Sequence, residues 1–426
     1  MATVDNVNGV EEAKAAAGAF IDSIAQELVA ASHDIHAHPE LGWQEHHASA
    51  LLADLGRRHG LDVELGAYGI ETAFVARSGT SGANVAVCCE YDALPGIGHG
   101  CGHNIIGAAG LGAGLALAEL ARVIDGRVTI LGTPAEEVDR GGKRALLDAG
   151  AFADADVAMM VHPEAGDVER VPYLATDRLS VQFHGRSAHA SSSPWQAVNA
   201  LDAIVLAYNG LSTLRQQLEP VEKVHGIITE GGVADNVIPD YTAGLFRARA
   251  PSSERLAVLK ERVLACFEGA ATQTGCRLEA AWTGGHEDVR ANRALAAAYR
   301  RNGEAIGRRF AEPHVVAMHV AGSTDMGDVS KVVPSIHPVI AMCPLDVPGH
   351  SEAFAEWAVS ARGDRAVVDG AKALAMTGID VWLRPDLLAA AREEFAWAKA
   401  RAKMKAKANS GEGPFAQSGA QSPAPR

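Results

Sequence analysis

The sequence predicts an α/β fold interrupted by a smaller α+β unit, and two observations support this prediction. Up to about residue 175, runs rich in β-branched residues alternate with glycine-containing loops and helical stretches, which is typical of a sheet with flanking helices. Between Ala175 and about Val289 the order becomes strand, helix, two strands, helix and strand, as in a ferredoxin-like unit. We therefore expect a larger domain with a mixed sheet and an inserted lid or dimerisation domain.

The larger domain is expected to begin with two helices within residues 11–59. Three apolar runs after them predict buried strands, and a segment rich in alanine and glycine predicts a closely packed helix. The strands are residues 84–89, 126–131 and 156–161, and the helix is 107–120. In the inserted domain the six expected elements are residues 178–183, 195–217, 223–229, 241–247, 253–274 and 276–282.

The changes of pattern also place the domain boundaries. We assign residues 1–175 and 290–398 to the larger domain and residues 176–289 to the inserted one. From Lys399 to the last residue, lysines are followed by serine, glycine, proline and glutamine, a composition that cannot bury a core. We therefore predict a disordered tail over 399–426.

Composition narrows the class of protein. The chain has 426 residues, of which 48% are hydrophobic, enough for two domains with cores of their own. A formal net charge of −14 argues against nucleic acid or anionic membranes as partners. No apolar signal core and no run of about 20 apolar residues is present, so we expect a cytoplasmic protein. Six cysteines without small-domain disulfide spacing fit the same compartment.

Metal-binding side chains follow the first expected strand. The run from Glu90 to Asn104 contains Asp92, Cys101 and His103 among several glycines. Cys101 and His103 are two residues apart, so both side chains can face one side of a loop, and the glycines let the backbone approach an ion. A thiolate with an imidazole suits zinc, manganese or cobalt. The alternative is a buried free cysteine beside a core histidine.

The next two strands end in the same way. Residues 126–131 lead into Glu136 and Glu137, and residues 156–161 lead into His162. On an extended backbone neighbouring side chains point to opposite sides, so one glutamate can bind metal while the other serves as a general base. A glutamate pair alone is more often a solvated surface pair. Far along the chain, His350 lies in a polar turn before a helical stretch and could supply a closing ligand.

Together these segments resemble the M20 peptidase and amidohydrolase family, in its aminoacylase-like branch with a Cys-x-His metal pair, over roughly residues 20 to 380. The resemblance implies a dinuclear metal centre and a Glu136 base that activates a metal-bound water. Asp92 matches an acidic position beside the metals, where it would orient a ligand. The metal ligands that the resemblance implies are Cys101, His103, Glu137, His162 and His350.

The resemblance extends to the inserted domain and to one loop after it. His189 matches a histidine that reaches the neighbouring subunit's active site and stabilises the oxyanion, which implies a homodimer or higher homo-oligomer. Asn236 matches an asparagine that contacts substrate, and Arg249 an arginine that holds a carboxylate. Ser323 lies in a segment that matches a pocket-lining loop. No G-x-S-x-G elbow surrounds it, which argues against a serine nucleophile.

These features predict a metal-dependent hydrolase that cleaves a C–N bond of a small substrate bearing a carboxylate. N-acyl amino acids, dipeptides and aryl amides all fit, and the cofactor would be two ions of manganese or zinc, with cobalt also suitable. One alternative is hydrolytic deamination of an activated aromatic amine. A cysteine nucleophile and a binding protein without catalysis are the others, and the Glu136–Glu137 pair argues against the last.

Overall fold

The computed structural model describes residues 9–311 and 322–409, and its larger part is built on a six-stranded mixed sheet. The strand order is β1-β2-β4-β3-β5-β11. Strands β4, β3, β5 and β11 run parallel, whereas β2 is antiparallel to both β4 and β1. The strands are β1 Val63–Leu65, β2 Phe74–Ser78, β3 Asn84–Cys89, β4 Arg127–Gly132, β5 Val157–Met159 and β11 Ser335–Ile336. The mixed α/β fold is thus as expected.

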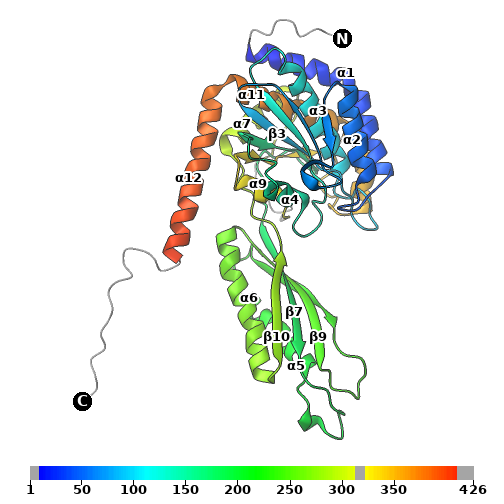
Figure 1. Ribbon diagram of the computed structural model, residues 1–426, viewed down its shortest axis with the longest axis vertical. Coiled ribbons are helices and arrows are strands. Elements are labelled where there is room, and N and C mark those ends of the chain that lie inside the picture. The colour runs from blue at the N-terminus through cyan, green and yellow to red at the C-terminus, as the bar shows by residue number, and fades with distance from the viewer. Residues whose placement is uncertain (1–8, 312–321, 410–426) are drawn as a thin grey trace, which may run out of the picture.

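Helices cover both faces of this sheet (Figure 1). On one face α1, α3 and α11 pack against one another and α2 and α7 join them, while the shorter α4 and α9 lie on the other face. The first two helices match the pair expected within residues 11–59. These helices are α1 Val10–Ala37, α2 His46–Arg58, α3 His103–Leu120, α4 Gly142–Asp148, α7 Arg293–Ala305, α9 Met326–Ser330 and α11 Ala361–Leu383.

Short elements complete the edge of the larger part that carries the polar loops. Strand β6 (His162–Glu164) pairs in parallel with β12 (Val339–Ala341), and α10 (Glu352–Ala358) begins directly after a Ser351 cap. Two 3₁₀ turns occur at η1 Ala67–Gly69 and η2 Pro194–Gln196. Because β6 begins at His162, that residue starts a new strand rather than ending the preceding one.

The inserted unit has a four-stranded antiparallel sheet and a hydrophobic core of its own. Its strand order, β10-β7-β9-β8, and its two helices are those of the expected ferredoxin-like arrangement. Figure 1 shows it extending away from one end of the larger part. Its elements are β7 Ala175–His184, α5 Ala200–Arg215, β8 Lys223–Glu230, β9 Tyr241–Ala250, α6 Ser253–Thr274 and β10 Arg277–Gly284. Its role as a lid or dimerisation domain, and the domain boundaries, stay predictions.

One expectation about the end of the chain is wrong in part. Helix α12 (Pro385–Asn409) continues past Lys399, where the sequence predicted a structureless tail. The residues concerned are mostly alanine, lysine and arginine, which have high intrinsic helix propensity, so a low apolar content did not prevent a helix. The rest of that tail, residues 410–426, lies outside the described residues. None of the described helices is long and apolar enough to cross a membrane.

Helix α3 packs closely on strand β3 because glycine stands at the contact. A Cβ at Gly110 would lie 2.7 Å from the Cys88 carbonyl oxygen and 2.8 Å from the Cys89 sulfur. We expect Gly110→Ala to lower the free energy of unfolding by about 1–3 kcal/mol, because backbone atoms must move apart. Gly269→Ala is the control, since an added Cβ there meets nothing within 4 Å. Denaturant unfolding measures both, and a Gly110→Ala protein as stable as wild type would contradict the packing argument.

Candidate active site

Four segments of the chain bring the five predicted ligands together at the carboxyl edge of the sheet. Cys101 Sγ lies 3.4 Å from His162 Nε2. Glu137 Oε1 lies 3.6 Å from His350 Nε2 and 3.8 Å from His103 Nε2. Ligand atoms of all five residues fall in overlapping groups, within each of which the atoms are no more than 4.8 Å apart. The spacing is therefore compatible with metal ions held between them.

The backbone positions two of the ligands. His103 is the first residue of α3, which places its ring beside the end of β3. His350 adopts a left-handed conformation with φ of 57°, and its backbone N–H donates to the Gly100 carbonyl at 2.9 Å. This hydrogen bond ties the His350 turn to the loop that carries Cys101.

Several atoms in this cluster have no hydrogen-bond partner among the described residues. They are the buried His103 Nε2 and Glu137 Oε1, together with Glu90 Oε2. Unpaired buried nitrogen and oxygen atoms are rare in proteins and each one calls for an explanation. A divalent cation would satisfy them, and the combination of thiol, imidazole and carboxylate suits zinc, manganese or cobalt. The residues present thus fit the implied metal centre.

Asp92 links two of the candidate ligands. Its Oδ1 lies 2.8 Å from His103 Nδ1, and its Oδ2 accepts a hydrogen bond from the Glu137 backbone N–H at 2.8 Å. The first contact leaves His103 Nε2 facing the cluster, which is how carboxylates commonly orient metal-binding histidines.

The glutamate pair lies in a turn and not on extended backbone, so the reasoning from strand geometry was wrong. The turn follows Ala135, a non-glycine residue with φ of 58°. The Ala135 backbone N–H donates to Glu45 Oε1 at 2.6 Å, so a buried carboxylate from another segment of the chain holds the turn. Burial, with the nearby Asp92, raises the pKa of Glu45 to about 7. Nothing in the sequence around Glu45 signals this contact, because it stands just before an ordinary amphipathic helix.

Glu136 is the candidate general base beside the ligand cluster. Burial raises the pKa of its carboxyl well above the ordinary value, and the neighbouring carboxylates Glu137 and Glu90 raise it further. Raised pKa values are common among carboxyl groups that accept and return protons in catalysis. Glu136 and Glu137 line the same cleft as three of the other candidate ligands.

The sequence did not reveal a buried ion-pair network whose carboxylates act on Glu136. Lys143 Nζ contacts Glu90 and lies 2.6 Å from Asp325 Oδ1, and all three side chains are fully buried. The Lys143 backbone N–H also donates to Asp325 Oδ2 at 2.9 Å. Burial alone would lower the pKa of Lys143, but Asp325 and Glu90 raise it well above the ordinary value. The feature of the sequence that points to this network is Glu90, an acidic residue directly after an apolar strand.

The cleft beside the cluster has a volume of about 330 Å³ and contains two of the predicted substrate contacts. Arg249 donates to the Ser323 hydroxyl at 2.9 Å. Arg178 and Arg247 share Asp139, at 2.5 and 2.7 Å, whereas Arg249 has no carboxylate within ion-pair distance among the residues of 9–311 and 322–409. Burial, with the nearby Arg247, lowers the pKa of Arg249. An anionic group of a ligand would therefore find a guanidinium without a counter-charge.

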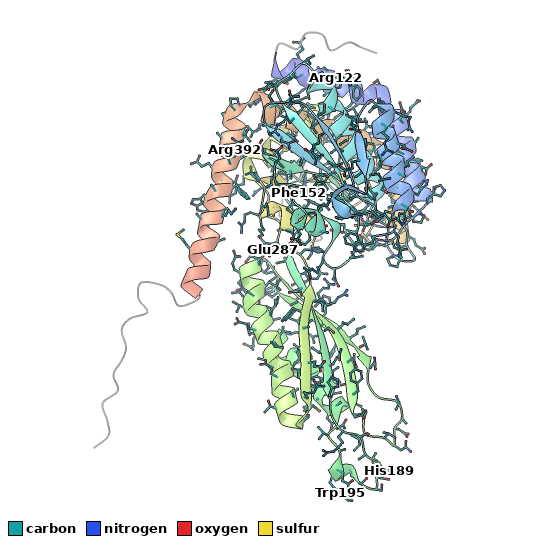
Figure 2. The ribbon with its side chains drawn as sticks, in the orientation of Figure 1. Arg122, Phe152, His189, Trp195, Glu287 and Arg392 are labelled. Atoms are coloured by element: carbon teal, nitrogen blue, oxygen red, sulfur yellow. The ribbon has the colours of Figure 1, made fainter. Side chains whose placement is uncertain are left out.

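His189 and Asn236 lie in the inserted unit and not at the ligand cluster. Figure 2 shows His189 at the far end of the inserted unit, near Trp195 and away from the larger part. The Ala190 N–H donates to the Asn236 carbonyl at 3.0 Å, so the two predicted residues lie close together on an exposed surface. Within one chain neither lines the cleft, and their roles stay predictions.

The fold and the convergent ligand set define a metal-dependent hydrolase. The family model described as Peptidase family M20/M25/M40 matches residues 86–376. This chain belongs to that family. It is 40% identical to the Xaa-Arg dipeptidase of Mus musculus, over 91% of this chain and 93% of that protein. It is also 31% identical to one of the p-aminobenzoyl-glutamate hydrolase chains of Escherichia coli, over 61% of this chain and 58% of that protein.

Solved structures show the same fold at low sequence identity. A dinuclear metal-binding M20 peptidase from Bacillus subtilis has a TM-score of 0.68 at 19% identity, covering 85% of this chain and 99% of that one. An aminobenzoyl-glutamate utilization protein from Klebsiella pneumoniae has a TM-score of 0.63 at 22% identity, covering 86% and 98%. These structures show the fold, and the family model together with the murine relative confirms the family assignment predicted from the motifs.

Proposed function

We propose that this enzyme hydrolyses the amide bond of a small substrate that carries a carboxylate: an N-acyl amino acid, a dipeptide or an aryl amide. The observation that carries this proposal is the position of Glu136 between a convergent ligand cluster and a cleft containing Arg249. The name of the murine relative adds dipeptides ending in arginine to the candidates.

The proposed centre holds two divalent ions per chain, manganese or zinc, with cobalt also suitable. Cys101, His103, Glu137, His162 and His350 would hold them, with His103 oriented by Asp92. When bound, the ions supply an acidified water and polarise the scissile carbonyl. Glu136 takes the proton of the attacking water and returns it to the nitrogen of the leaving amine. Arg249 and Ser323 hold the carboxylate of the substrate during both steps.

The proposal includes a homodimer in which His189 of one chain stabilises the oxyanion in the other and Asn236 contacts substrate. Its support is that His189 lies far from the cluster of its own chain (Figure 2). Exposed apolar side chains, among them Trp195 and Val233, lie in the same region of the inserted unit. The proposal also places the enzyme in the cytoplasm, in keeping with free thiols at all six cysteines.

Amine release from a substrate panel tests the proposed function. The panel comprises alanyl-arginine, N-acetyl-leucine, p-aminobenzoyl-glutamate and a nitro-substituted aminobenzoate, each assayed with manganese- or zinc-loaded enzyme. We expect metal-dependent turnover of at least one amide and loss of that turnover after chelation. Release from the aminobenzoate alone would establish the deaminase alternative, and silence across the panel with metal bound would contradict the proposal.

A further inference from the structure

One wall of the cleft carries a carboxylate without a counter-charge. Glu164 lies on β6, two residues beyond His162, and lines the cleft. Among residues 9–311 and 322–409, its Oε2 accepts a hydrogen bond only from the N–H of the next residue, Ala165, at 3.2 Å. No lysine or arginine in the described part of the chain lies within ion-pair distance of it. Glu164 and Arg249 are therefore alike in that neither has a counter-charge among the described residues, and their own charges are opposite.

Two buried polar side chains that line the same cleft also lack hydrogen-bond partners among the described residues. Tyr173 is 7% exposed and His337 is 1% exposed, and both line the cleft. The Tyr173 hydroxyl and both His337 ring nitrogens have no hydrogen-bond partner among the described residues. Their rings meet edge to face with centroids 4.6 Å apart. Leaving such a buried group without a partner is unfavourable, so three unpaired atoms in one cleft point to a ligand that satisfies them.

The other carboxylates that line the cleft either belong to the ligand cluster or pair with arginine. Glu136 and Glu137 belong to the catalytic cluster, and Asp139 is paired with Arg178 and Arg247. Glu164 is thus the carboxylate left for a ligand. A carboxylate, a phenol oxygen and an imidazole nitrogen can all accept hydrogen bonds. Their natural common partner is a positively charged group with several N–H donors.

We propose that Glu164, Tyr173 and His337 form a subsite for an ammonium or guanidinium group of the substrate, opposite in charge to the carboxylate subsite at Arg249. The preferred substrate then carries both a cation and a carboxylate. The inference rests on the proposed amide hydrolysis and specifies which amides the cleft selects.

Two pairs of matched substrates test this subsite. N-acetyl-lysine is compared with N-acetyl-norleucine, which lacks only the side-chain amine, and β-alanyl-norleucine with butanoyl-norleucine, in which a methyl group replaces the terminal amine. We expect wild-type kcat/KM to favour the cationic member of at least one pair by about 10- to 100-fold, as for a partly buried charged hydrogen bond. Glu164→Gln should reduce that preference to within about 3-fold while kcat/KM for the neutral member and bound metal stay unchanged.

Further variants separate recognition from folding. Tyr173→Phe removes one acceptor and should reduce the preference several-fold without changing the neutral reference. Glu230→Gln, at an exposed position on β8, is the matched control and should keep the wild-type preference. Equal use of both members by wild type, an unchanged preference in Glu164→Gln, or an equal loss on both members would overturn the subsite. Failure of wild type on all four substrates would instead count against the proposed hydrolysis.

Discussion

Glu136→Gln is expected to lower kcat by about 10²- to 10⁴-fold. The glutamine side chain cannot take a proton from the attacking water or return one to the leaving amine. Glutamine has the same shape, so the cleft and the candidate ligands should keep their positions. Metal content should therefore match that of wild type. Steady-state kinetics together with elemental analysis of the purified protein measures both quantities.

Glu137→Gln is the matched comparison for this variant. Glu137 contributes to the ligand cluster with His103 and His350, so its replacement should lower metal content as well as turnover. The two variants thus separate the base from the ligand, although the residues are adjacent in the chain. A Glu136→Gln enzyme with wild-type turnover would exclude the proposed role of this side chain.

The sequence predicted those candidate ligands that lie in the segments after apolar strands. The segments that follow β3, β4 and β5 carry Cys101, His103, Glu137 and His162, and the parallel arrangement of these strands brings the segments to one edge. His350 needed the family resemblance, because only the tertiary fold places it against the Cys101 loop. In each of these cases, local pattern or family likeness carried the information.

The residues that the sequence did not reveal act across long separations in the chain. Glu45 holds the turn at Ala135, and Tyr173 meets His337. None of these residues stands in a pattern of its own, since a single polar residue beside an apolar run is ordinary. Their importance comes from burial without other partners, which exists only once the chain is folded.

Lys143→Met is expected to lower the free energy of unfolding by about 3–5 kcal/mol, because it leaves the buried Glu90 and Asp325 carboxylates without their cation. Activity should fall as well, because Asp325 lies in the same loop as Ser323 and bonds to the Lys143 backbone. Denaturant unfolding and kcat/KM on the same preparation measure the two effects. A loss of activity without a loss of stability would place Lys143 in the chemistry itself.

Two further variants identify burial of the charge as the cause. Lys372→Met removes a lysine whose partner, Asp22, is 61% exposed, and the cost should be no more than about 1 kcal/mol, as for other surface ion pairs. Adding Asp325→Asn to Lys143→Met removes one of the two uncompensated charges and should restore part of the lost stability. The opposite result is a double variant that is less stable than Lys143→Met by as much as Asp325→Asn alone destabilises the wild type. In that case the three side chains do not act as one network, and Lys143 stabilises the fold by packing alone.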